Sequence, residues 1–153
     1  MNIRYNLLHY SKVVGVILVI LVIKLSLKQH TAGDFYPSGQ TKSSGIFVDG
    51  KAEGTWTWWY ENGSKMTEGT FVHGMRNGTW RTWYENGVQK SEARYADDKL
   101  NGTYVSWHHN GKIKYKGQYK DDKLDGTQLH YDTLGRLNAR QKFKDGLAIN
   151  EVR

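Results

Sequence analysis

The stretch Gly54-Thr55-Trp56-Thr57-Trp58-Trp59-Tyr60-Glu61-Asn62-Gly63 carries the pattern that decides the fold. Its β-branched and aromatic residues favour an extended strand. Asn62-Gly63 then supplies two residues that tolerate positive φ, the strongest short signal for a β-hairpin. Residues 64–72 predict the return strand, and residues 73–78 form a glycine-bounded connection. The stretch therefore predicts one β-hairpin and a link to the next.

The hairpin pattern recurs every 24 residues. The opening returns as Gly78-Thr79-Trp80, Gly102-Thr103-Tyr104 and Gly126-Thr127-Gln128, and the turn glycine as Gly87, Gly111 and Gly135. A degenerate copy begins near Thr31, with Phe35, Gly39, Phe47 and Gly50 at matching positions. A fixed period of this length is typical of stacked supersecondary units. We therefore expect an all-β repeat domain over residues 31–153, an elongated single-layer antiparallel sheet of about five hairpins.

The alternation of side chains along the strands predicts two different faces. With Asn62 and Gly63 as a two-residue loop, Glu61 faces Ser64, and the pairs that follow are Trp58 with Thr67, Trp56 with Gly69, and Gly54 with Phe71. One face then carries Trp56, Trp58, Tyr60 and Phe71. The glycines across from the bulkiest rings leave room for those rings over the neighbouring backbone. We expect this to be the packing face.

The opposite face is polar apart from one aromatic position in each repeat. That position is occupied by Phe35, Trp59, Trp83, Trp107 and Tyr131, expected opposite Met66, Lys90, Lys114 and Asn138 in the last four copies. Rings spaced two strands apart would stand about 10 Å from one another. They either cover the second face of a sheet that has no other layer, with the lysines stacked on them, or form an aromatic binding track. The first interpretation is favoured, and the candidate partner-binding residues are Trp59, Trp83, Trp107, Tyr131, Lys90 and Lys114.

Residues 1–30 predict a membrane anchor and linker. Residues 13–23 are 11 uninterrupted apolar residues, and the run reaches about 18 only if the flanking lysines extend toward the membrane surface. An uncleaved transmembrane or signal-anchor helix is favoured over a cleaved signal peptide, because no small-x-small cleavage pattern follows directly. A buried segment of a soluble fold is a third alternative. We expect a single-pass protein of the cytoplasmic membrane with an extracytoplasmic repeat domain, or a secreted or periplasmic protein after cleavage.

The charge distribution gives no sign of a nucleic-acid partner. The formal net charge is +7, of which residues 1–30 contribute +4, and the remainder has 18 Lys and Arg against 15 Asp and Glu. A nearly balanced repeat domain lacks the concentrated basic face that nucleic-acid binding needs. We therefore expect no nucleic-acid partner.

No catalytic constellation stands out either. The chain has no cysteine, no phosphate-binding glycine loop before a helix, and no His-Glu-x-x-His. The polar cluster around His108-His109 is better read as structural, because His108 takes the position of Tyr60 and Tyr84 in the repeat and adjacent strand residues point to opposite faces. We expect no enzyme activity, no cofactor and no metal site.

The segment Gly69-Thr70-Phe71-Val72-His73-Gly74-Met75-Arg76-Asn77-Gly78-Thr79-Trp80 resembles the MORN repeat, whose signature is Gly-x-aromatic-x-x-Gly-x-x-x-Gly-x-Gly. The last signature glycine is replaced by Trp56, Trp80 or Tyr104, and the middle one by Asp98 or Asp122, so the chain looks like the bacterial variant type. The resemblance implies rows of hairpins in one long twisted sheet. Proteins of this type are often catalogued as antitoxins.

Two functions from different classes follow from the sequence and the resemblance. The first is a membrane-anchored interaction module that binds a protein or, less favoured, a glycan or lipid headgroup. The second is an antitoxin or immunity protein that neutralises a cognate toxin.

Overall fold

The computed structural model describes residues 29–149, which fold into a single antiparallel sheet of twelve strands. The strands are β1 (Gln29–Phe35), β2 (Thr41–Val48), β3 (Lys51–Trp59), β4 (Lys65–Val72), β5 (Met75–Trp83), β6 (Gln89–Ala96), β7 (Lys99–Trp107), β8 (Ile113–Lys120), β9 (Lys123–Leu124), β10 (Gly126–Tyr131), β11 (Leu137–Lys144) and β12 (Leu147–Ile149). Neighbours in the sheet follow chain order, except that β9 is a short side branch on β8. The prediction of an all-β row of hairpins is confirmed.

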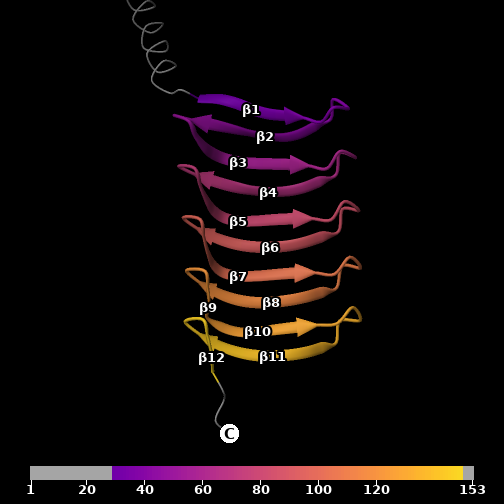
Figure 1. Cartoon of the computed structure of the whole chain (residues 1–153), viewed down its shortest axis with the longest axis vertical. Helices are drawn as coiled ribbons and strands as arrows, with labels where there is room; N and C mark the ends of the chain where they lie inside the picture. Colours follow the sequence, from indigo (N-terminus) through magenta and orange to yellow (C-terminus); the bar gives the residue numbers. More distant parts are fainter. Residues whose placement is uncertain (1–28, 150–153) are drawn as a thin grey trace, which may run out of the picture.

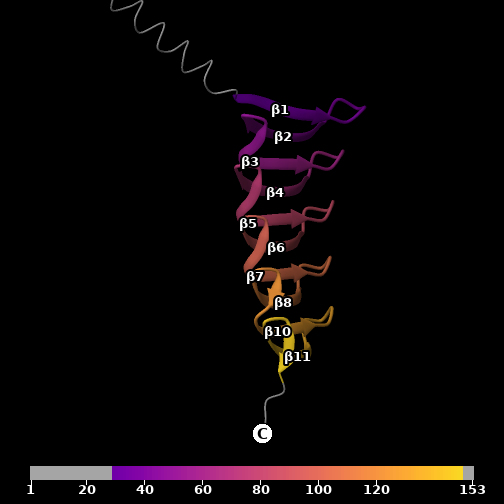
Figure 2. The same ribbon diagram turned by 60° about the vertical axis from the view of Figure 1, so that its left-hand side comes forward.

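The sheet is open and elongated (Figure 1). The hairpin loops project along one side of the row and the connections between hairpins along the other, and a view turned by 60° keeps this arrangement (Figure 2). No helix within residues 29–149 is long and apolar enough to cross a membrane. The predicted anchor helix at residues 13–23 lies outside the described residues.

The hairpin loop has three residues, not the predicted two. Gly63 N donates to Tyr60 O at 2.9 Å and Tyr60 N donates to Ser64 O at 2.8 Å, with Gly63 at φ 81°. This is a turn closed by a residue in the left-handed region, a common alternative for an Asn-Gly hairpin. Glu61 therefore does not face Ser64.

The longer loop changes the strand pairing beside it. A register shift between Trp58 and Trp59 pairs Trp59 with Lys65 rather than Met66, while the predicted pairs Trp58–Thr67, Trp56–Gly69 and Gly54–Phe71 are confirmed. The same shift pairs Trp83 with Gln89, Trp107 with Ile113 and Tyr131 with Leu137. The predicted pairing of Trp83 with Lys90, Trp107 with Lys114 and Tyr131 with Asn138 is therefore wrong.

The packing face joins each hairpin to the one before it. Trp56 is 7% exposed, and its ring covers Gly45 of the preceding hairpin. A Cβ atom at Gly45 would lie 2.1 Å from that ring, and one at Gly69 would lie 2.1 Å from Trp80. Each indole N–H also donates to a backbone carbonyl of the preceding hairpin at 3.2 Å, Trp56 to Ile46 and Trp80 to Thr70. The ring-over-glycine contact thus lies between hairpins.

Aromatic rings continue this contact along the face. Phe71 and Trp80 have centroids 4.9 Å apart and meet edge to face, a geometry that adds about 0.5–1.5 kcal/mol beyond burial. The connected rings are His30, Phe47, Trp56, Trp58, Phe71, Trp80 and Tyr95, followed by a second group of Tyr104, Tyr115, Tyr119 and His130. The core of this single-layer sheet is therefore a row of rings.

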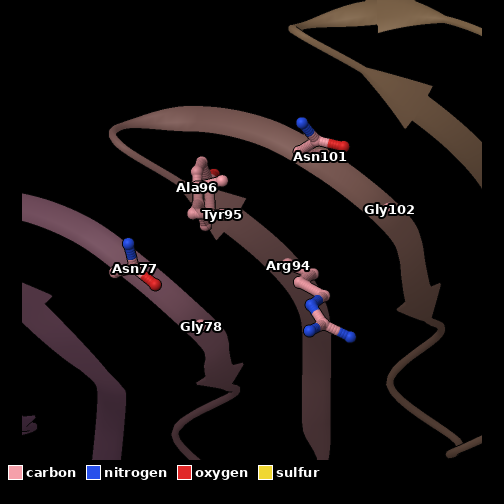
Figure 3. A pocket seen from close by; sticks show the side chains of 7 residues that line it. All are labelled: Asn77, Gly78, Arg94, Tyr95, Ala96, Asn101 and Gly102. Atoms are coloured by element: carbon pink, nitrogen blue, oxygen red, sulfur yellow. The ribbon is translucent and has the colours of Figure 1, made fainter.

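Each repeat bends sharply near its beginning. The bends lie at Gly54, Gly78, Gly102 and Gly126, whose φ values are 68°, 74°, 120° and 124°, and the ladder skips residues beside the first three of them. Glycine tolerates such φ values without the Cβ clash of other residues. The strands turn visibly at Gly78 and Gly102 (Figure 3). The bends leave hollows between neighbouring repeats.

Candidate binding surface

The face opposite the packing face, called the polar face below, presents Thr55, Thr57 and Trp59 on β3 and their equivalents in the later repeats. The candidate rings Trp59, Trp83, Trp107 and Tyr131 occupy the last positions of β3, β5, β7 and β10. All four are partly buried. Phe35, at the same position of β1, is 66% exposed. The structure therefore places one ring at the same point of every repeat.

These rings differ from those of the packing face in what they contact. Within residues 29–149, no ring-to-ring contact involves Trp59, Trp83, Trp107 or Tyr131. In the part of the chain that the structure describes, Trp83 alone among the four has a cation over it, since Lys65 Nζ lies 5.3 Å from its centroid. The four residues, called the aromatic column below, are ordered by the sheet without being part of the ring core.

The two candidate lysines do not stack on the aromatic column. Lys90 Nζ lies 5.7 Å from the ring centroid of Tyr84, and Lys114 is exposed on β8. The three-residue hairpin loop shifts both out of register with Trp83 and Trp107. Lys65, from the preceding hairpin, takes the place expected for Lys90.

A column of hydroxyl donors beside the aromatic column ties the repeats together. Tyr36, Tyr60 and Tyr84 each donate from Oη to the backbone carbonyl of the aromatic-column residue in the next hairpin, at 2.8, 2.8 and 2.9 Å. His108 Nε2 makes the equivalent contact with Tyr131 O at 3.0 Å. The structural interpretation of His108 agrees with this geometry. The tyrosine links were not foreseen, although their signal is the tyrosine that follows the aromatic position in the first three copies, at Tyr36, Tyr60 and Tyr84.

Some charged side chains of the polar face and turns form ion pairs. Arg81 Nε lies 2.8 Å from Glu92 Oε2. Arg76 Nε lies 2.9 Å from Asp98 Oδ1, and the hydrogen bonds from Arg76 hold the pKa of Asp98 below its usual range. Both pairs are exposed, so each contributes little to stability. Among residues 29–149, no group of three His, Asp or Glu side chains is placed to hold a metal ion.

Burial affects the tyrosines of the opposite, packing face. It raises the pKa of Tyr115, whose hydroxyl also contacts Tyr119 and Gln128, and it raises the pKa of Tyr104. Both phenols are therefore neutral hydrogen-bonding groups at physiological pH.

Two adjoining hollows lie at the bends of β5 and β7. The larger has a volume of about 480 Å³, and Asn77, Arg94 and Asn101 contribute side chains to it (Figure 3). The smaller, about 270 Å³, is lined by Thr79, Glu92 and Thr103 and shares Arg94 and Gly102 with the first. The sequence did not reveal these hollows, because they arise only where the strands bend.

Comparison with known proteins identifies the repeat. Residues 52–73, 76–97 and 100–121 match the family described as MORN repeat variant. No curated protein matches the chain. Among solved structures, the crystal structure of accessory secretory protein 1, 2 and 3 in Streptococcus pneumoniae aligns with 12% identity and a TM-score of 0.37, over 65% of this chain and 18% of that chain.

The family match falls on the hairpins whose geometry is described above. The three matched segments are consecutive and begin 24 residues apart, the spacing of the hairpins in the sheet. MORN repeats suggest a repeat module that binds proteins. Residues 52–121 are therefore three consecutive MORN repeats of the variant type.

Proposed function

We propose that the chain is a non-catalytic module that binds another protein through its polar face. The observation that carries this proposal is the aromatic column, Trp59, Trp83, Trp107 and Tyr131. Its rings recur in every hairpin from β3 onward and make no ring-to-ring contact within the described residues. Partly buried aromatic residues that the scaffold already orders are typical anchors of protein interfaces.

A protein partner suits this surface better than a small ligand. The column extends along the row of hairpins, with about 10 Å between successive rings. Small-molecule sites are usually enclosed apolar cavities, whereas the hollows beside the column are partly open and lined by polar as well as apolar groups. An extended partner surface would contact several repeats at once.

The substitutions Trp83→Ala and Trp107→Ala test the proposal. The partner is first captured from the native cell with the full chain and identified, and its affinity is then measured for each variant. We expect each substitution to weaken binding roughly tenfold or more, as for interface hot spots, while circular dichroism shows an intact sheet. Lys120→Ala is the matched control, an exposed change at the end of β8 that should leave binding unchanged.

The outcome also decides what kind of module this is. Wild-type affinity in both folded tryptophan variants would remove the aromatic column from the interface and reject the proposal. A captured partner that kills cells lacking this chain would make the module an antitoxin, the alternative that the family resemblance implies.

The proposal includes membrane anchoring through residues 1–30. Its support is the apolar run at residues 13–23 with lysines at both ends, which favours a spanning segment. The full chain should sediment with membranes and resist extraction by carbonate, and a chain without residues 1–30 should not. Recovery of the full chain in the soluble fraction would contradict anchoring.

A further inference from the structure

Arg94, at the centre of the polar face, has a charge that the described residues leave unpaired. Arg76, Arg81 and Arg136 each lie within 2.9 Å of a carboxylate oxygen. Arg94 takes part in none of the ion pairs or side-chain hydrogen bonds found within residues 29–149, and it borders both hollows.

The Arg94 side chain lies against the bend of β7. A Cβ atom at Gly102 would lie 3.3 Å from Arg94 Cδ and 3.4 Å from Arg94 Cβ. Gly102 has φ 120°, so glycine both permits the bend and leaves the space that the arginine stem occupies. At the equivalent position of the next repeat, Gln118 exchanges hydrogen bonds with Thr103. Arg94 is therefore the cation of this position in the third repeat, as Lys142 is in the last, and its stem lies against Gly102.

The residues beside Arg94 also distinguish the larger hollow from the spaces between the other bends. The residues that precede the four bend glycines are Glu53, Asn77, Asn101 and Asp125. Only the space between the second and third bends is flanked by two neutral side chains, Asn77 and Asn101, which stand on the strands on either side of Arg94 (Figure 3). The outer bends carry a carboxylate at this position, Glu53 or Asp125, in place of a neutral side chain.

The nearby acids do not cancel the charge of Arg94. Glu92 of the smaller hollow is paired with Arg81 at 2.8 Å. Asp97 and Asp121 lie in the turns, where they accept hydrogen bonds from Asn77 and Asn101 at 3.4 Å, and neither lines a hollow. Among the described residues, Arg94 is the one charged residue that lines the larger hollow.

We propose that the larger hollow, with Arg94 at its centre, binds a carboxylate, presented by an aspartate or glutamate side chain of the partner protein. A guanidinium can donate two parallel N–H bonds to a carboxylate, which gives strength and orientation together. Asn77 and Asn101 flank the bound group, and Thr79 offers a hydroxyl in the smaller hollow. The inference rests on the proposed function, because Arg94 shares the polar face with Trp83 and Trp107, and it specifies the chemistry of the partner.

The test is an NMR titration of the isotopically labelled full chain in a non-ionic detergent. The probe is an acetylated, amidated tetrapeptide, Gly-Glu-Glu-Gly, and its matched control is Gly-Gln-Gln-Gly. We expect the glutamate peptide to shift the Nε–H signal of Arg94 and the side-chain amide signals of Asn77 and Asn101 in a saturable manner. The glutamine peptide should leave them in place. Equal shifts from both peptides, or none from either, would overturn the proposal.

Two variants separate this site from general charge attraction. Arg94→Gln should weaken binding of the glutamate peptide roughly tenfold or more, the usual loss when a charge-assisted hydrogen bond is removed. Arg140→Gln removes the same charge from exposed β11 and should change binding less than twofold. Equal losses in the two variants would reject a specific site.

Two further arms complete the experiment. Inorganic phosphate that shifts the same signals at lower concentration than the glutamate peptide would show a phosphate site and overturn the carboxylate assignment. Trp83→Ala should preserve the Arg94 shifts, because the peptide has no aromatic contact to lose. Failure of the aromatic column in partner binding therefore remains distinguishable from failure of the carboxylate site.

Discussion

At the scale of single residues, the close contact between an aromatic ring and the backbone of a glycine defines the repeat. Gly45 and Gly69 are buried under Trp56 and Trp80. In the third repeat the chain itself departs from this rule, because Ala93 stands at the glycine position, is 5% exposed, and pairs with Tyr104 in place of a tryptophan. The size of the covering ring and the size of the covered residue are therefore coupled.

Gly69→Ala tests this coupling. The new methyl group would lie 2.1 Å from the Trp80 ring, so the indole must move and the contact between the second and third hairpins must loosen. We expect a loss of about 1–3 kcal/mol in the free energy of unfolding, the usual cost of overpacking. Urea denaturation followed by tryptophan fluorescence measures it. Thr70→Ala, the adjacent change on the polar face, is the control.

The double variant Gly69→Ala with Trp80→Tyr sharpens the same prediction. It recreates the Ala93 and Tyr104 combination of the next repeat. Its destabilisation should be smaller than the sum of the two single effects by more than about 0.5 kcal/mol, the limit within which independent sites add. Additive effects would show that ring and backbone are not in contact.

At the scale of the hairpin, the links between neighbours matter as much as the pairing within. Tyr60 and Tyr84 each bind the carbonyl of a column tryptophan one hairpin further on. Each indole of Trp56 and Trp80 binds a carbonyl one hairpin back. Every central hairpin is thus fixed from both sides, and the same links hold the backbone of the aromatic column in position.

The hairpin also shows how far sequence reasoning reaches. Strand positions, the two faces and the central register follow from the 24-residue period and the alternation of side chains. The loop type did not follow, because Asn62-Gly63 suits both a two-residue turn and a three-residue loop that ends on glycine. The glycine that the Trp56 ring covers was equally ambiguous. Trp56 pairs with Gly69 in its own hairpin, but its ring lies over Gly45 in the hairpin before.

The hollow around Arg94 was not predicted for a different reason. It depends on the bends at Gly78 and Gly102 and on three strands at once. The period repeats these glycines, but neither the period nor the alternation of side chains shows that the strands bend at them. The neutral side chains at Asn77 and Asn101 acquire meaning only when the bends bring them beside the arginine.

At the scale of the whole molecule, the packing weakens from the second repeat toward the last. The ring position changes from Trp56 and Trp80 to Tyr104 and finally Gln128. Gln128 is 4% exposed, and its Nε2 has no hydrogen-bond partner in the described protein, an arrangement that costs about 1–3 kcal/mol. On β11 every residue except Phe143 is exposed. Stability should therefore be graded along the row.

Native-state hydrogen exchange of the full chain should show this gradient, with amides of β10 and β11 exchanging before those of β3 to β6. In a repeat array each unit contacts only its neighbours, so weakly packed units can open without unfolding the rest.

The substitution Trp56→Gln tests the same gradient, because it places in the second repeat the glutamine that the last repeat has at this position, Gln128. It should speed exchange in β2 to β4 and leave β8 to β11 unchanged, as mass spectrometry of protected peptides can show. Equal acceleration in every strand would mean that the sheet opens as one cooperative unit, because damage at one ring would then reach hairpins that it does not touch.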